Sequence, residues 1–325
     1  KYLNICFYGG GAWGQALSIT LASLGHKSKL IVSDQTRANE INSGISRRFS
    51  QIKLSPLITS SVNAKEVIKE SNLVFITTES KRVMSVIEQI NLLNNNEINI
   101  VITSKGFANK HGETFNEIIQ NQFPTLTTGI LTGPTFADEI ANNFPAAAIL
   151  ASNHINFANS ICNLFKNSCL RLYQSNDPLG ASIAGAVKNI IAIGAGIIEG
   201  LNLGDNAKAA LITRGISETS RLIKSSGGNY ETAFGLAGIG DMSLTCSGPH
   251  SRNMAYGMHL VTKTNKNKTL DLVEGVNAVE ATLVLAKKFN IELPIVNAIN
   301  EILNKEGNIK EIIHKLLSRP IKNEF

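Results

Sequence analysis

The sequence predicts an α/β fold in which an N-terminal domain built on a parallel sheet precedes a second, all-α C-terminal domain. Short apolar runs alternate with helical segments through the first half, and a glycine-rich turn directly follows the first run. After Asp177-Pro178 the pattern changes to long helical stretches. Because 325 residues exceed the size at which a single core usually stops growing, we expect two domains, 1–176 and 177–325.

The first half carries strand candidates separated by helices. The apolar run from Tyr2 to Tyr8 ends in glycines, and a helical period from Ala16 onward stops at Gly25. Further strands are expected at 29–33, 73–77, 98–103 and 146–150. Since strands that alternate with helices are joined by crossover connections, these strands predict a parallel sheet.

The turn after the first strand has the spacing of a dinucleotide-binding motif. Gly9, Gly11 and Gly14 lie between a strand and a helix, where the backbone can approach a pyrophosphate and helix N-terminal N–H groups point at its charge. Asp34 follows Gly14 by 34 − 14 = 20 positions, at the end of the second strand, where a carboxylate can accept hydrogen bonds from an adenosine ribose. A tight turn and a solvated aspartate are the alternatives. The spacing favours a Rossmann-like dinucleotide-binding domain.

The stretch from Leu179 to Gly200 predicts a helix deep in the second domain, because its small residues let backbones pack closely. Its longest uncharged apolar segment, Ile190 to Ile198, is about half of the roughly 20 residues that a membrane span needs. Lys188 and Asn189 interrupt the apolar surface. A lysine in low dielectric has a pKa moved toward neutrality, so Lys188 is the predicted proton donor and acceptor. The alternative is a lysine that extends to solvent.

Two polar segments follow that are expected to be loops that build a site. The glycine-dense run from Gly235 to Asp241 shows neither strand nor helix periodicity, and Ser251-Arg252-Asn253 comes shortly after it. Arg252 can hold a phosphate through two parallel hydrogen bonds, and Ser251 and Asn253 can add neutral ones. Any one of these residues taken alone is more often a solvated surface group.

Composition excludes several other classes of function. The net charge is +6 and no basic run is longer than two residues, so nucleic acid is not an expected partner. Because the longest uncharged apolar segment is too short to span a membrane, no stable membrane insertion is expected. Four cysteines without a C-x-x-C pair indicate reduced thiols. The histidines lack ligand spacing, so no metal is expected. No charged-then-apolar leader precedes the first strand, and a cytoplasmic protein is expected.

Taken together, these residues resemble the bacterial-type NAD(P)-dependent glycerol-3-phosphate dehydrogenases over nearly the whole chain. The resemblance rests on motifs that occur in the family's order: Gly9-x-Gly11-x-Trp13-Gly14, Thr103-Ser-Lys105-Gly106, Leu131-Thr-Gly133-Pro134-Thr135-Phe136-Ala137, Ala186-Val-Lys188-Asn189, Asn206-Ala-Lys-Ala-Ala-Leu-Ile-Thr-Arg214-Gly215, Gly235 to Asp241, Ser251-Arg252-Asn253 and Val273-Glu274-Gly275.

The resemblance implies an oxidoreductase that exchanges a hydride between NAD or NADP and C2 of dihydroxyacetone phosphate or sn-glycerol 3-phosphate, with Lys188 as general acid and base. It places eight residues around the substrate: Lys105, Gly133, Thr135, Lys188, Asp241, Ser251, Arg252 and Asn253. Arg252 and Asn253 suit the phosphate, whereas Lys105 and Asp241 suit the hydroxyl end and the orientation of Lys188. It places eleven at the cofactor: Gly9, Gly11, Ala12, Trp13, Gly14, Asp34, Lys105, Ala137, Arg252, Leu272 and Glu274. Simple packing is the alternative for Trp13.

The sequence departs from the family pattern at two places. Ser33 stands where many members carry an arginine for the 2′-phosphate of NADP, so the pair Ser33-Asp34 favours NAD, although Arg37 could partly compensate. The segment Ile76-Thr77-Thr78 stands where a proline usually follows the strand, which leaves the adjacent loop geometry open.

Two alternative functions remain at this point. Other two-domain dehydrogenases with a mid-helix lysine, such as 3-hydroxyacid dehydrogenases or ketopantoate reductase, share the Lys188 chemistry but should lack the phosphate-site residues. A redox-sensing NAD(H)-binding regulator has no need of a proton-transfer lysine. The resemblance further implies a homodimer and a product that supplies phospholipid synthesis.

Overall fold

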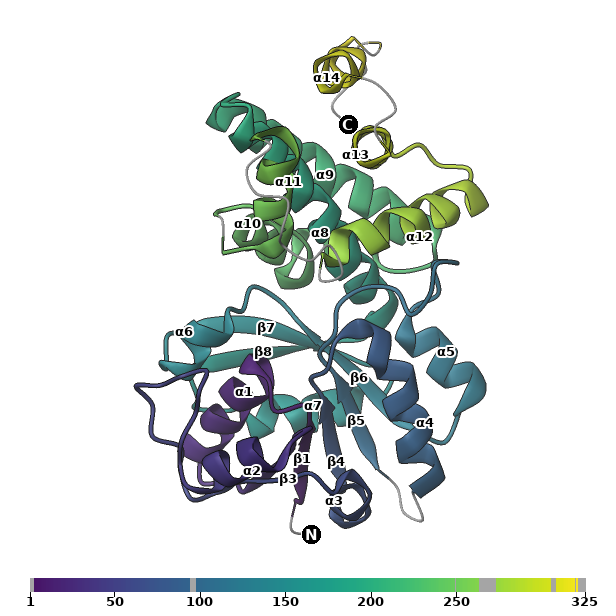
Figure 1. Ribbon diagram of the computed structural model, residues 1–325. Helices are drawn as coiled ribbons and strands as arrows, with labels where there is room; N and C mark the ends of the chain where they lie inside the picture. The colour runs from purple at the N-terminus through teal and green to yellow at the C-terminus, as the bar shows by residue number, and fades with distance from the viewer. Residues whose placement is uncertain are drawn as a thin grey trace. The chain divides into compact units, whose positions relative to one another are not determined.

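The structure is a computed structural model that describes residues 3–93, 98–248, 250–262, 273–304, 308–318 and 320. The chain divides into two compact units (Figure 1). The first unit comprises Lys1–Ala108 with Glu113–Ser182, and the second comprises Asn109–Gly112 with Ile183–Phe325. Each unit is described by itself below.

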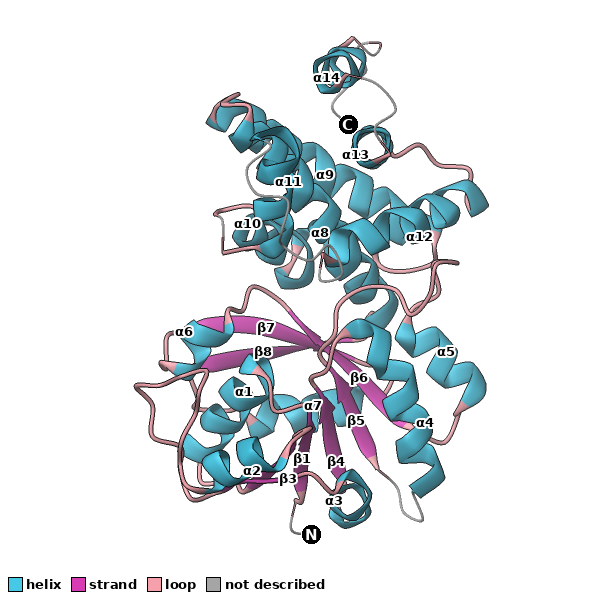
Figure 2. Cartoon of the chain, viewed as in Figure 1, coloured by secondary structure: helices cyan, strands magenta, loops and turns pink. Residues whose placement is uncertain are grey.

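An eight-stranded sheet forms the centre of the first unit (Figure 2). Its strands are β1 (Ile5–Tyr8), β2 (Ser28–Ile31), β3 (Ile58–Ser61), β4 (Leu73–Ile76), β5 (Asn99–Ile102), β6 (Thr127–Thr132), β7 (Ala146–Ala151) and β8 (Leu170–Ser175). They lie in the order β3-β2-β1-β4-β5-β6-β7-β8, and every neighbouring pair is parallel except β6 with β7. The order reverses direction beside β1, which places the turn after β1 at the topological switch point where α/β sheets bind ligands.

Helices cover both faces of this sheet because alternate strand residues point to opposite sides. Phe7 and Phe75 stack with ring centroids 4.9 Å apart in the core of one face, whereas Cys6 and Val74 belong to the core of the other. The first face packs against α1 (Ala12–Ser23), α2 (Gln35–Asn42), α6 (Ala137–Ala141) and α7 (Ile155–Leu164). The second packs against α3 (Ala64–Glu70), α4 (Val83–Leu93) and α5 (Phe115–Gln122). A short 3-10 turn, η1 (Ser80–Arg82), precedes α4.

All regular secondary structure among the described residues of the second unit is helical. Its elements are α8 (Pro178–Gly200), whose first turn belongs to the first unit, α9 (Asp205–Ser225), η2 (Tyr230–Phe234), η3 (Leu236–Gly240), α10 (Asp241–Thr245), α11 (Arg252–Thr262), α12 (Glu274–Lys288), α13 (Pro294–Leu303) and α14 (Ile309–Leu317). Among the described residues, α8 alone is long and apolar enough to cross a membrane, but 94% of its most apolar window is buried inside the protein. As expected from its small residues, α8 is a core helix.

The predicted fold class is confirmed, with corrections to individual elements. The sequence prediction missed β3 and β8, which carry polar residues at exposed positions, and β6, which is buried but contains three threonines and a glycine. It also did not foresee the antiparallel pairing of β6 with β7. Two predicted loops are helical. Leu236–Gly240 is a π-helical turn that leads into α10 at Asp241, and Arg252 and Asn253 begin α11. Glycine masks helical periodicity because it contributes no side chain to an apolar face.

Candidate active site

The turn between β1 and α1 is shaped to receive a pyrophosphate. Gly9 has a φ of +120°, and a Cβ at Gly14 would lie 2.1 Å from the Gly9 carbonyl oxygen, so neither position accepts a larger residue without strain. A Cβ at Gly11 would meet nothing within 4 Å, which leaves space in front of the α1 N-terminus. Gly11 caps this helix without a side-chain acceptor, so the first-turn N–H groups can face an anion. This cradle fits the diphosphate of a dinucleotide.

The turn is held from β4 by the segment that departs from the family pattern. The Thr77 hydroxyl donates a hydrogen bond to the Gly9 carbonyl oxygen at 2.7 Å, and the Ser104 hydroxyl donates one to the Thr78 carbonyl oxygen at 2.6 Å. A Cβ at Gly14 would also lie 2.8 Å from the Thr77 hydroxyl oxygen. Thr77 therefore fixes the backbone of the turn from a neighbouring strand, a contact that sequence reasoning missed.

Asp34 lies beyond the end of β2 and is the N-cap residue of α2. Its carboxylate accepts a hydrogen bond from the Arg37 backbone N–H at 2.8 Å, and the Arg37 guanidinium donates to the Gly10 carbonyl oxygen. A pocket of about 340 Å³ adjoins these residues and is lined by Gln15, Asp34, Arg37, Glu40, Ile41, Ile45, Arg47 and Arg48. Each of its arginines has a partner: Arg47 pairs with Glu40 at 2.6 Å and Arg48 with Asp138 at 3.2 Å.

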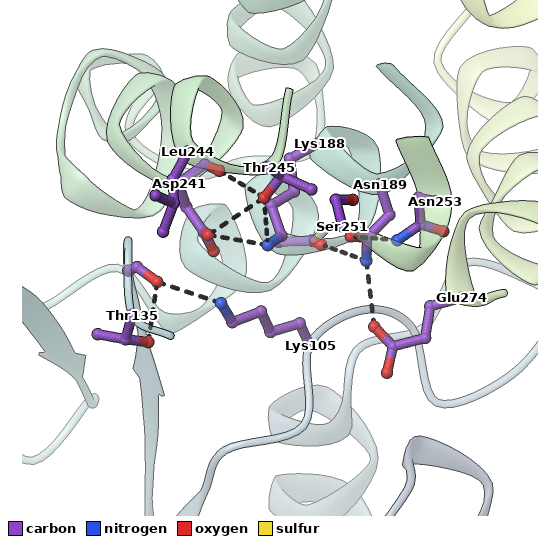
Figure 3. Close-up of polar contacts among 12 residues, drawn as sticks. Lys105, Thr135, Lys188, Asn189, Asp241, Leu244, Thr245, Ser251, Asn253 and Glu274 are labelled. Carbon is purple, nitrogen blue, oxygen red and sulfur yellow. Dashed lines mark hydrogen bonds and ion pairs between the residues drawn. The ribbon is translucent and has the colours of Figure 1, made fainter. Parts of the chain in front are cut away.

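A second group of predicted residues gathers in the first unit at the ends of β5 and β6. The Lys105 ammonium donates to the Gly133 carbonyl oxygen at 3.1 Å, and the Thr135 hydroxyl donates to the same oxygen at 3.2 Å (Figure 3). Gly133 has a φ of +152°, and a Cβ there would lie 2.8 Å from the Ala148 Cα, so the close approach requires glycine.

Three predicted cofactor residues also contribute to packing. Ala12 and Trp13 begin α1, Ala137 begins α6, and all three pack partly buried against the core that includes Phe7. The packing alternative for Trp13 is thus part of its role in this structure, whether or not it also faces a ligand.

In the second unit, Lys188 lies in the middle of α8 and is 6% exposed. Its ammonium contacts the Asp241 carboxylate at 2.8 Å and the Thr245 hydroxyl at 2.9 Å, both from α10 (Figure 3). The Thr245 hydroxyl in turn donates to the Asp241 carbonyl oxygen at 2.6 Å. Burial disfavours a charged lysine, whereas an adjacent carboxylate favours it. The structure therefore places a buried amine against one carboxylate, which orients it.

Cys246 directly follows Thr245 in the chain and carries a buried thiol. Burial raises the pKa of the Cys246 thiol to about 12, and the positive charge of Lys188 opposes that shift. The thiol therefore stays protonated near neutral pH.

The residue after Lys188 anchors a second cluster in this unit. The Asn189 amide donates to the Glu274 carboxylate at 3.2 Å and accepts from the Asn253 amide at 3.0 Å (Figure 3). Asn253 also accepts from the Gly275 backbone N–H at 2.9 Å. These bonds join the start of α11 and the start of α12 to the centre of α8, so Asn189 links two predicted binding residues.

The remaining predicted residues lie close to this cluster in sequence. The Ser251 hydroxyl accepts from the Met254 backbone N–H at 3.3 Å and caps α11, and Arg252 is exposed at the first position of that helix. Leu272 lies outside the described residues. Sequence reasoning did not predict Thr245 as a site residue, and only its spacing of one helical turn after Asp241 could have indicated it.

Comparisons with known proteins identify the family to which this chain is similar. A family model described as NAD-dependent glycerol-3-phosphate dehydrogenase N-terminus matches residues 4–158, and its C-terminal counterpart matches 177–314. Proteins named glycerol-3-phosphate dehydrogenase [NAD(P)+] are 37% identical in Exiguobacterium sp. (99% of this chain, 97% of the relative) and 35% identical in Fusobacterium nucleatum (99% of each chain).

A solved structure extends the similarity to three dimensions. The crystal structure of glycerol-3-phosphate dehydrogenase from Coxiella burnetii has a TM-score of 0.90 and 31% identity, and the match covers 98% of this chain and 100% of that one. The family predicted from the sequence motifs is confirmed by matches that span both units. The chain belongs to the NAD-dependent glycerol-3-phosphate dehydrogenase family.

Proposed function

We propose that this chain interconverts dihydroxyacetone phosphate and sn-glycerol 3-phosphate with NAD(P)H, and that Lys188 is its general acid and base. The observation that carries the proposal is the buried Lys188 ammonium held 2.8 Å from Asp241 and 2.9 Å from Thr245. A buried charged amine is stable only beside a group of opposite charge. A buried titratable group that its neighbours hold in one orientation is suited to proton transfer.

The bound nicotinamide supplies or accepts the hydride at C2 of the substrate, and the chain's own residues handle the proton. In reduction, Lys188 donates its proton to the oxygen that develops negative charge on C2, and in oxidation it removes the proton of the C2 hydroxyl. Asp241 and Thr245 orient the amine, and Asp241 stabilises the ammonium until the transfer occurs.

The substrate phosphate is assigned to the start of α11. Arg252 is exposed there and can offer a planar pair of donors to phosphate oxygens. Asn253 already uses its carbonyl oxygen and one N–H within the second unit, which leaves one N–H of that amide for a substrate oxygen. Ser251 can add a hydroxyl donor. Lys105, Gly133 and Thr135 are assigned to the substrate from the first unit.

The cofactor is assigned to the glycine turn and to Ala12, Trp13, Lys105, Ala137, Arg252, Leu272 and Glu274. Asp34 is assigned to the adenosine ribose. NAD is the preferred cofactor in this proposal. The Asp34 carboxylate repels a 2′-phosphate, and the three nearby guanidinium groups of Arg37, Arg47 and Arg48 already contact Gly10, Glu40 and Asp138.

The wider setting is proposed on the same basis. A homodimer in the cytoplasm that supplies glycerol 3-phosphate for phospholipid synthesis is consistent with the family and with the four free cysteines. The functional boundary is placed between residues 176 and 177, which the limits of the family models support. Light scattering on the purified chain tests the dimer, and a monomer at micromolar concentration would contradict it.

The central test is NADH oxidation with dihydroxyacetone phosphate by the wild type and by Lys188→Ala. The variant should lose roughly 10²–10⁴-fold in kcat, the usual contribution of a general acid, and should still bind NADH. Lys287→Ala, which removes an exposed lysine of α12, is the matched control and should keep wild-type turnover. Wild-type-like turnover of Lys188→Ala, or wild-type activity on a carboxylate substrate alone, would refute the proposal.

A further inference from the structure

The carboxylate that contacts Lys188 follows a rare helical geometry. From Leu236 to Gly240 the backbone forms a π-helical turn, in which the Gly240 N–H bonds the Gly235 carbonyl oxygen five residues earlier at 3.1 Å. The Asp241 N–H continues this pattern onto the Leu236 carbonyl oxygen. Asp241 is the first residue of α10, directly after the turn. Such turns are rare, and they frequently occur at functional sites.

A π-helical turn changes the direction in which every later side chain points. Successive residues of an α-helix are rotated by about 100°, so one residue more or less in the preceding turn rotates a side chain by about that angle. Asp241 is 1% exposed and its carboxylate reaches Lys188 at 2.8 Å. A rotation of about 100° would carry the carboxylate away from the amine, so the ion pair depends on the length of this turn.

Gly238 allows the turn to pack closely against η2. A Cβ at Gly238 would lie 2.0 Å from the Ala233 carbonyl oxygen and 2.4 Å from the Ala233 carbonyl carbon. These are backbone atoms of η2, and Ala233 is fully buried, so they cannot move aside as a flexible side chain would. Only glycine lets the turn lie this close to the preceding segment.

We propose that Gly238 and the π-helical turn around it are a positioning device for the proton-transfer pair, which sets the Asp241 carboxylate against Lys188. The proposal rests on the proposed role of Lys188. It assigns no contact with substrate to Gly238, which acts through Asp241. Substitution at Gly238 should therefore change turnover and its pH dependence more than it changes cofactor binding.

The first test compares Gly238→Ala, Asp241→Glu and the double variant in the NADH assay. Gly238→Ala should lower kcat at least tenfold, because the added methyl group moves the start of α10 away from η2 and from Lys188. The longer side chain of Asp241→Glu should lower kcat in the wild-type background but recover at least part of the loss in the Gly238→Ala background. The double variant should thus have a higher kcat than the value expected if the fold losses of the two single variants multiplied.

The pH profile separates positioning from general damage. In the reducing direction Lys188 must carry its proton, and a weaker contact with Asp241 makes the ammonium easier to deprotonate. The pH above which kcat falls should therefore move downward in Gly238→Ala. Gly248→Ala is the control, since a Cβ there would meet its nearest atom at an ordinary 3.9 Å, and it should match the wild type.

A second variant addresses the case in which Gly238→Ala does not fold. Deletion of Ile239, whose side chain is 40% exposed, shortens the turn by one residue at little cost in burial. It should bind NADH and unfold cooperatively but lose at least 100-fold in kcat. Wild-type kcat and pH profile in either variant, absence of rescue in the double variant, or failure of both variants to fold would overturn the inference. Activity retained in Lys188→Ala would instead refute the proposed function.

Discussion

Glu218 provides a sharp test of how the helical unit is held together. It is 3% exposed on α9, and its two carboxylate oxygens accept hydrogen bonds from the backbone N–H groups of Ile295 at 2.7 Å and Val296 at 3.3 Å. These are first-turn N–H groups of α13, whose own N-cap residue, Leu293, has no acceptor side chain. Glu218 thus caps a helix 77 residues away and places negative charge at its positive end.

The magnitude follows from the two N–H groups. Leaving a buried donor without a partner costs about 1–3 kcal/mol. Glu218→Ala removes the acceptors of both donors, and we expect the free energy of unfolding to fall by about 2–6 kcal/mol. Glu218→Gln keeps one acceptor oxygen, so we expect about half of that loss.

Urea unfolding followed by far-ultraviolet circular dichroism measures these losses. The matched control is Glu280→Ala, which removes an exposed carboxylate of α12 and should change stability by no more than about 0.5 kcal/mol. The kcat of folded Glu218→Ala should stay within about threefold of the wild type, because Glu218 lies outside the assigned site. A loss below about 0.5 kcal/mol for Glu218→Ala would show that the capping argument is wrong.

Three further predictions concern the two sites and the thiols. Asp34→Asn should raise kcat/KM with NADPH relative to NADH by at least tenfold, since it removes the charge that repels a 2′-phosphate, and an unchanged ratio would contradict the assignment of Asp34. Asp241→Asn should lower kcat at pH 7 and move the upper pH limit of reduction downward, because the Lys188 ammonium loses its carboxylate; a superimposable pH profile would exclude this role. Burial raises the pKa of the Cys162 thiol from 9.0 to about 11, so its thiolate fraction at pH 8 falls by roughly 100-fold. Alkylation with iodoacetamide, followed by mass spectrometry, should be correspondingly slower in the native protein than in urea, and equal rates would refute the shift.

The features that sequence predicted correctly are those written in local patterns. The glycine turn joins a strand to a helix within a few residues, and the apolar composition of α8 predicts its burial directly. The prediction failed where it looked for other patterns. It searched for continuous apolar runs and so missed β8, in which buried and exposed residues alternate, and the π-helical turn before Asp241 consists mostly of glycine and small residues without apolar periodicity.

The sequence by itself determined the family, the glycine turn between β1 and α1, and a buried lysine, because each is written in motifs of residues that are near one another in the chain. Asp241 was an expected neighbour of that lysine, but only the tertiary structure revealed Thr245 as its second partner. Thr245 meets Lys188 across 57 residues, and Asn253 meets Asn189 across 64. Such contacts depend on how the helices pack and on the direction in which the side chains of each helix point. Both are set by the whole fold and by no local pattern in the sequence.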